Sequence, residues 1–177
     1  MRLHPHPRRA RAPKGTTSGG PVTLRIDIER GVQIANAMGQ KTEFEYMFDG
    51  DLNQVEFLLH EIGHALSLGL DTDPSLWTAG SGRRGYKAGR IDNAVSLALG
   101  SPGVLATWEE AVVLAAESRL FERLGHPIDP YQLAETAWIQ SVADEELAQA
   151  LRSPEAAALA EQILAWAQAT GIVTEAD

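Results

Sequence analysis

The sequence predicts an α+β fold in which a small N-terminal β-sheet packs on a buried helix that carries two histidines, and a mainly helical C-terminal half follows. Residues 22–29 and 41–48 alternate between apolar and polar side chains, which is typical of half-buried strands. Residues 52–69 are apolar around nearly the whole surface of a helix, and residues 107–171 contain a series of helix caps. We therefore expect two strands, one core helix and several C-terminal helices.

The size and composition of the chain are those of one globular domain. The chain has 177 residues, of which 44% are hydrophobic and 22% are charged. Residues 1–20 are rich in proline, arginine and glycine without periodicity, so we expect a flexible basic tail there and one domain over residues 21–177. The basic residues of the tail, which contains no acid, are Arg2, Arg8, Arg9, Arg11 and Lys14.

The composition also excludes several kinds of site and partner. The chain has no cysteine, so a metal ion can be bound only by nitrogen and oxygen. It has neither an apolar signal segment nor a membrane span, which predicts a cytoplasmic protein without a membrane partner. The net charge of −9 argues against broad nucleic-acid binding. Only the tail and the loop with Arg83, Arg84, Lys87 and Arg90 leave such binding open.

The N-terminal elements are expected in a simple order. The strand over residues 22–29 is followed by a turn or short helix at 31–39 and by the second strand at 41–48. The core helix is predicted to begin near Leu52 with Asp51 as its N-cap, and to end at Gly69, a typical C′ residue.

The later elements are predicted mainly from their caps. A turn at 71–74 leads to a long loop at 77–90 and to a short helix at 92–99.

A long helix is then expected over residues 107–124. Asp129 and Ser153, each followed by proline, cap two more helices, and the second of these ends at Gly171. Residues 144–146 are expected to start a helix between them.

The core helix carries the residues with catalytic chemistry. His60 and His64 are four residues apart, so their imidazoles project from one face about one turn apart and can reach one metal ion. Zinc suits this pair because it accepts neutral imidazole and leaves a position open for water. Glu61 is placed to take a proton from that water. Ionisable side chains on an apolar helix are costly unless they are paired or coordinated, which favours a metal site over ordinary core histidines.

A catalytic zinc ion usually has three protein ligands, so the third must come from elsewhere. On a helical wheel of residues 107–124, Glu110 and Glu117 fall near the middle of the apolar side and Glu109 lies at its margin. We predict Glu110 as the third ligand, and Glu117, Asp71 and Glu109 as hydrogen-bond partners of the ligands or as alternative ligands. Alternatively, Glu110 interacts only with the positive N-terminus of its helix, an explanation that does not cover Glu117.

Residues 60–74 resemble the metzincin stretch of the matrixin peptidases. In those proteins a glycine lies three residues, and a third histidine six residues, after the second histidine. Here the matching positions hold Ser67 and Leu70, and leucine cannot bind zinc. The metzincin methionine turn is also missing, because every methionine of this chain precedes the motif. The third ligand is therefore not expected in this stretch.

Residues 110–120 resemble the ligand helix of the ImmA/IrrE-type zinc peptidases, which are gluzincin-like and carry an upstream His-Glu-x-x-His motif. Glu110 takes the place of the family's ligand and Glu117 that of its later acid. Val112 stands where the family has asparagine, and the family's Leu-Leu-x-Pro ending is missing. Trp108-Glu109-Glu110 is similar to zincin-like domains of polyvalent proteins on mobile elements. The resemblance implies a zincin-like fold.

The resemblance also implies an activity, that of a zinc metallopeptidase. Such a hydrolase would cut a peptide bond in a specific protein or peptide partner, for example a repressor of a mobile element, with Glu61 activating the water. The donor that stabilises the oxyanion could by residue type be Tyr86, Arg83, Arg84 or His126. The alternative is a zincin fold without turnover that binds a protein or is stabilised by zinc. The intact Glu61 argues against this alternative.

Overall fold

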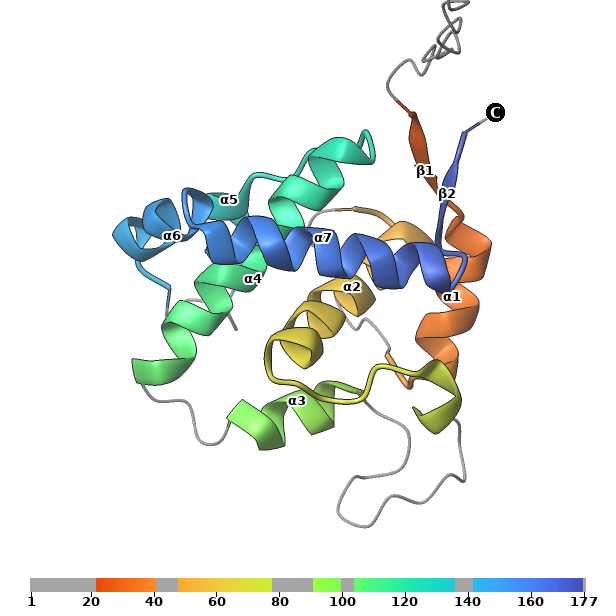
Figure 1. Ribbon diagram of the computed structural model, residues 1–177, viewed down its shortest axis with the longest axis horizontal. Coiled ribbons are helices and arrows are strands. Elements are labelled where there is room, and N and C mark those ends of the chain that lie inside the picture. Colours follow the sequence, from red (N-terminus) through yellow and green to blue (C-terminus); the bar gives the residue numbers. More distant parts are fainter. Residues whose placement is uncertain (1–21, 41–47, 78–90, 100–103, 136–141, 177) are drawn as a thin grey trace, which may run out of the picture.

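The computed structural model describes residues 22–40, 48–77, 91–99, 104–135 and 142–176 (Figure 1). Helices predominate, and the described residues include one antiparallel pair of strands, so the fold is α+β in the general sense. The basic tail and the segment 78–90 lie outside the described residues. The elements in chain order are β1 (Leu24–Ile26), α1 (Ile28–Ala37), α2 (Asp51–Ser67), the 3-10 helix η1 (Pro74–Trp77), α3 (Ile91–Leu99), α4 (Val104–Arg123), α5 (Pro130–Ala134), α6 (Asp144–Leu151), α7 (Pro154–Ala169) and β2 (Val173–Glu175).

The N-terminal segment differs from the predicted strand over residues 22–29. Only Leu24–Ile26 are strand, because Asp27 accepts a hydrogen bond from the backbone N–H of Arg30 and so caps helix α1. The predicted turn or short helix at 31–39 is the remainder of α1 and its C-terminal turn. Most of the second predicted strand, residues 41–47, lies outside the described residues. The partner of β1 is β2, with Ile26 opposite Val173.

Helix α2 occupies the centre of the molecule. Its N-cap is Gly50, so the prediction that Asp51 caps it is wrong. Asp51 instead lies in the first turn, where the positive end of the helix dipole stabilises an acidic side chain. Its end was predicted correctly. Gly69 has a positive φ of 68°, and the N–H of Leu70 donates to the carbonyl of Ala65 at 2.8 Å, as in a Schellman motif.

Among the described helices, those that pack most extensively against α2 are α1, α3, α4 and α7. Two glycines allow the closest approaches. A Cβ on Gly31 of α1 would lie 2.5 Å from Val55 Cγ2, and a Cβ on Gly63 of α2 would lie 3.1 Å from Val113 Cγ1 of α4 and 3.2 Å from Ile163 Cδ1 of α7. Such contacts leave little room for a side chain, so the helix that carries the histidines is enclosed on several sides.

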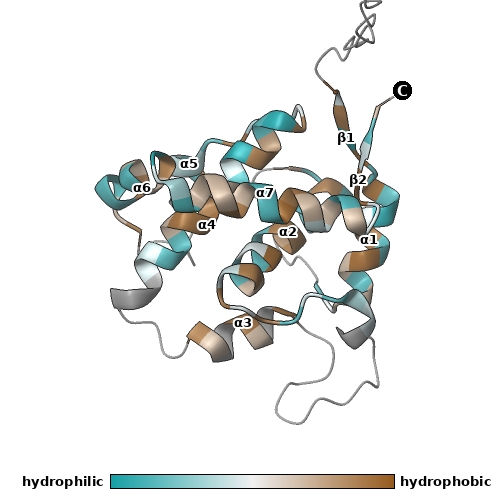
Figure 2. Ribbon diagram, viewed as in Figure 1, coloured by the Kyte–Doolittle hydropathy of each residue, from teal (hydrophilic) through white to brown (hydrophobic). Residues whose placement is uncertain are grey.

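The C-terminal helices mostly follow their predicted caps. Asp129 accepts hydrogen bonds from backbone N–H groups at the start of α5, and Ser153 does so for α7. The long helix α4 begins three residues before the predicted Thr107, and α6 begins at Asp144 as expected. Helix α7 carries both hydrophilic and hydrophobic residues along its length (Figure 2), which is typical of a helix with one face on a core.

Among the described helices, none combines the length and apolar character that crossing a membrane requires.

Candidate metal centre

The two histidines of α2 direct their Nε2 atoms to one place. His60 and His64 are both buried, each with 2% of its surface exposed. The two Nε2 atoms are 3.2 Å apart, and the rings meet edge to face with centroids 4.9 Å apart. This arrangement follows from the four-residue spacing, which places the side chains one helical turn apart. The two nitrogens can therefore bind the same ion.

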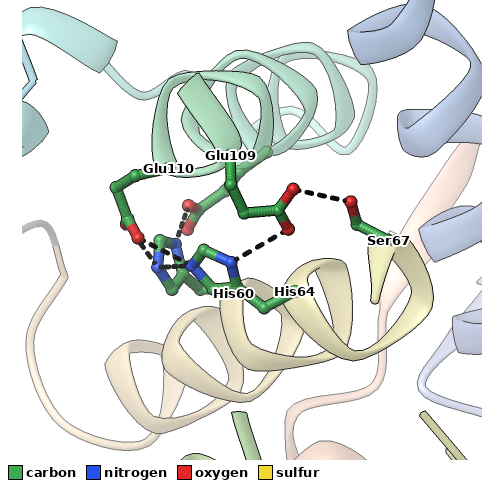
Figure 3. Close-up of polar contacts among 6 residues, drawn as sticks. His60, His64, Ser67, Glu109 and Glu110 are labelled. Carbon is green, nitrogen blue, oxygen red and sulfur yellow. Dashed lines mark hydrogen bonds and ion pairs between the residues drawn. The ribbon is translucent and has the colours of Figure 1, made fainter. Parts of the chain in front are cut away.

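Glu110 of α4 provides oxygen atoms at the same place. Its Oε1 lies 2.9 Å from His60 Nε2, and its Oε2 lies 2.8 Å from His64 Nε2. Figure 3 shows Glu110 facing both imidazoles across the gap between α2 and α4. One ligand atom from each of the three residues lies within 4.8 Å of the others, which is compatible with a shared metal ion. The described residues therefore include a group with two nitrogens and one carboxylate.

The polar contacts at this place fit a cation. Glu110 Oε1 is buried and lies 2.9 Å from His60 Nε2, so its charge has to be compensated by a proton on that nitrogen or by a metal ion bound to both residues. A buried carboxylate without such compensation is costly. The donor set of two imidazoles and one carboxylate is typical of catalytic zinc, and it leaves a coordination position open. The Glu110 side chain is 17% exposed, so the site is accessible mainly on that side.

Each histidine has a second carboxylate at its other ring nitrogen. His60 Nδ1 lies 2.8 Å from Glu117 Oε2, and His64 Nδ1 lies 3.4 Å from Glu109 Oε1. A carboxylate oxygen only accepts, so we assign the Nδ1 protons as donors. Ser67 Oγ donates to Glu109 Oε2 at 2.8 Å (Figure 3). These contacts orient both rings with Nε2 toward Glu110, as the outer partners of metal-bound histidines do.

Glu56 is a buried acid that the sequence analysis did not identify, and it interacts with Glu117. Glu56 is one turn before His60 on α2, and both Glu56 and Glu117 are 1% exposed. Burial, followed by the charge of Glu117 and a hydrogen bond with it, raises the pKa of Glu56 well above its usual range, and the charge of Glu61 adds a smaller increase. This direction favours the neutral acid, whose O–H can donate to Glu117. The four-residue spacing from His60 was the signal that could have identified it.

The carboxylates also change the protonation of the metal-free site. Burial alone would lower the pKa of both histidines, but Glu110 and Glu117 raise the pKa of His60 well above its usual value. Hydrogen bonds with Glu109 and Glu110 raise the pKa of His64 to about 9. Burial would raise the pKa of Glu110, but the two histidines lower it well below its usual range. Without a metal, protons supply the positive charge that this cluster requires.

The remaining predicted residues do not belong to the three-residue group. Glu61 is buried beside His60 on α2 and acts electrostatically on Glu56, but it is not among the residues that could share the ion. Asp71 is exposed and accepts a hydrogen bond from the N–H of Asp73 in the turn after α2.

Of the predicted oxyanion donors, His126 lies among the described residues and is not in the three-residue group. His126 packs edge-on against Phe48, with ring centroids 6.0 Å apart. The other three, Arg83, Arg84 and Tyr86, lie outside the described residues.

Comparison of the chain with protein-family models, with curated proteins and with solved structures gives no significant match. The interpretation of the metal centre therefore depends on its own geometry.

Proposed function

We propose that this protein is a zinc-dependent peptidase with a zincin-like arrangement that hydrolyses a peptide bond in a specific protein partner. The observation that carries the proposal is the convergence of His60 Nε2, His64 Nε2 and the Glu110 carboxylate, with ligand atoms from all three within 4.8 Å. The sequence places an acid, Glu61, directly after the first of these ligands. Two histidines and a glutamate with a nearby base are the groups that metal-assisted hydrolysis requires.

The ligand set favours zinc, which would be held by His60, His64 and Glu110. A bound zinc ion would polarise the carbonyl of a peptide bond and lower the pKa of a water molecule. Glu117 and Glu109 hold the two imidazoles in the orientation that presents their Nε2 atoms. Glu61 accepts a proton from the water and passes it to the leaving amine. In this proposal substrate approaches from the partly exposed side of the site, where Glu109 and Glu110 lie.

A second candidate function is a zinc-stabilised protein-binding module without turnover. The 2% exposure of both histidines favours it, because structural metal sites are enclosed by protein. The two functions differ in what Glu61 does. A base is required for hydrolysis, whereas a purely structural site has no need of one.

The test combines metal analysis with a cleavage assay. The wild-type protein should contain one zinc ion per chain, and Glu110→Ala should lose it. A peptide library from a digested proteome, read by mass spectrometry, should show new termini only with zinc-loaded protein. Glu61→Gln should keep the zinc and slow cleavage by about 10²- to 10⁴-fold, the usual contribution of a general base.

The matched control is Glu122→Gln, which removes an exposed acid from the same helix as Glu110. It should bind zinc and cleave like the wild type. Stoichiometric zinc without any zinc-dependent cleavage would exclude the peptidase and favour the structural module.

A further inference from the structure

Residues 107–110 form one turn near the start of α4, and their four side chains contact three other helices. Thr107 Oγ1 donates to Glu146 Oε1 of α6 at 3.0 Å, and Trp108 Nε1 donates to Glu155 Oε2 of α7 at 3.1 Å. The next two residues, Glu109 and Glu110, contact the histidines of α2. Successive side chains of a helix point about 100° apart, so the four residues of one turn can contact helices on different sides of α4. We call residues 107–110 the ligand turn.

The ligand turn lies close to the N-terminus of its helix, which begins at Val104. It follows directly on the first turn, whose backbone N–H groups lack intrahelical partners, so this end of the helix frays unless other contacts hold it. Glu110 nevertheless approaches two Nε2 atoms at 2.8 and 2.9 Å. Metal–ligand distances tolerate deviations of only about 0.2 Å, so a small shift of this turn would spoil the site.

We propose that Glu146 and Glu155 are positioning residues of the metal centre. By holding Thr107 and Trp108 from outside, they fix where the next two residues of the ligand turn lie, and so bring the Glu110 carboxylate to both histidines. Neither acid touches the site itself. The inference rests on the proposed function only in taking His60, His64 and Glu110 as metal ligands, and it does not require turnover.

The structure offers a control contact between the same helices. Arg123 of α4 forms an ion pair with Glu161 of α7, more than three turns beyond Glu110. This contact also joins α4 to α7, but it lies far from the ligand turn. Loss of the Glu161 side chain should therefore leave the zinc site intact, whereas loss of Glu146 and Glu155 should not.

The experiment measures zinc affinity by competition with a chromophoric chelator, and thermal unfolding of the metal-free protein, for four full-length chains. Glu146→Ala with Glu155→Ala should weaken zinc binding about tenfold, the lower end of the effect of removing direct partners of metal ligands, because neither acid contacts a ligand. Its metal-free unfolding temperature should stay near that of the wild type. Glu146→Gln with Glu155→Gln keeps an acceptor oxygen at both positions and should restore zinc affinity. Glu161→Ala should bind zinc like the wild type.

Two results would overturn the inference: wild-type affinity in the double alanine variant, or an equal loss of affinity in Glu161→Ala. If the metal-free form of the alanine variant unfolds, Trp108→Phe replaces it, because this change removes the indole N–H donor and keeps an aromatic ring. Unchanged zinc affinity in Trp108→Phe would then count against the inference. A wild-type chain that binds zinc and cleaves nothing contradicts the peptidase proposal alone. A wild-type chain that binds no zinc contradicts both.

Discussion

Glu56 and Glu117 form a pair of buried carboxyl groups behind His60, and their roles are unequal. Glu117 contacts His60 Nδ1 directly, whereas Glu56 is kept neutral by burial and by Glu117. A neutral carboxylic acid and an amide have similar shapes, and both can donate a hydrogen bond. We therefore expect that a negative charge is needed only at Glu117, the acid that lies 2.8 Å from His60 Nδ1.

Substitution by glutamine should distinguish the two acids. Glu56→Gln should leave zinc affinity close to that of the wild type, because the amide still donates to Glu117. Glu117→Gln should weaken zinc binding about 10- to 100-fold, because His60 loses the charge that orients its ring. Chelator competition measures both. An equal loss in the two variants would show that the pair does not carry one negative charge.

The protonation of His64 predicts how zinc binding depends on pH. Its pKa of about 9 in the metal-free protein means that the ring is protonated on both nitrogens, and so is positively charged, at neutral pH. Zinc binds only neutral imidazole, so one proton must leave. Apparent zinc affinity should rise roughly tenfold per pH unit for each proton released, up to a pH near 9. Competition titrations at several pH values, corrected for protonation of the chelator, test this; a flat profile would contradict it.

The same group predicts the opposite trend for the stability of the metal-free protein. The pKa of His64 is raised from 6.5 to about 9 on folding. Its stabilising contribution is therefore complete below pH 6.5 and is lost as the pH rises through 9. Free energies of unfolding in urea should show this decline in the chelator-treated chain, and His64→Gln should reduce it to the part that His60, whose pKa is also raised, contributes.

At the scale of elements, the approach of α1 to α2 depends on Gly31. Alanine usually favours a helix over glycine by roughly 1 kcal/mol. At this position a Cβ would lie 2.5 Å from Val55 Cγ2, so the steric cost outweighs the helix preference. Gly31→Ala should lower the free energy of unfolding by about 1–3 kcal/mol, measured in urea.

A second substitution provides the control for that prediction. Val55→Ala removes the clashing methyl groups, so adding it to Gly31→Ala should cost less than the sum of the two single changes. Strict additivity would show that the contact between Gly31 and Val55 does not limit the approach of the helices.

Helix caps were the most predictable elements because their signals are local. Asp129 and Ser153 each accept hydrogen bonds from N–H groups within three residues, and Gly69 adopts its positive φ without distant contacts. The helical wheel likewise placed Glu110 and Glu117 on one apolar face, and both contact His60 in the structure. The wheel could not give distances, because these depend on how α2 and α4 pack.

At the scale of the whole molecule, the least predictable feature is the sheet. Alternation predicted two strands, at residues 22–29 and 41–48, in one N-terminal sheet, whereas the described partner of β1 is β2 at residues 173–175. Arg25 Nε donates to Thr174 Oγ1 across 149 residues of sequence. Pairing over such a separation leaves no local pattern in the sequence, since it depends on how the helices between the two strands fold back.

Removal of β2 should show what this pairing contributes. Ile172 and Val173 are fully or almost fully buried, and the carbonyl of Ile172 accepts from the N–H of Asp27. A chain ending at Gly171 should lose about 3–6 kcal/mol of stability, because the burial of two such side chains no longer contributes. A chain ending at Glu175, which keeps β2, is the control for denaturation in urea. Equal stability of the two truncated chains would contradict the prediction.

The β1–β2 ladder also brings the two ends of the described chain together (Figure 1). The N–H of Ala176 donates to the carbonyl of Thr23 at 2.7 Å. A short peptide joining these residues would close the backbone into a ring, which could be reopened at the exposed turn after Gly125. The resulting circular permutant would still carry α2 and α4 on one uninterrupted stretch, so the order of the connections can change while the histidines and Glu110 stay together.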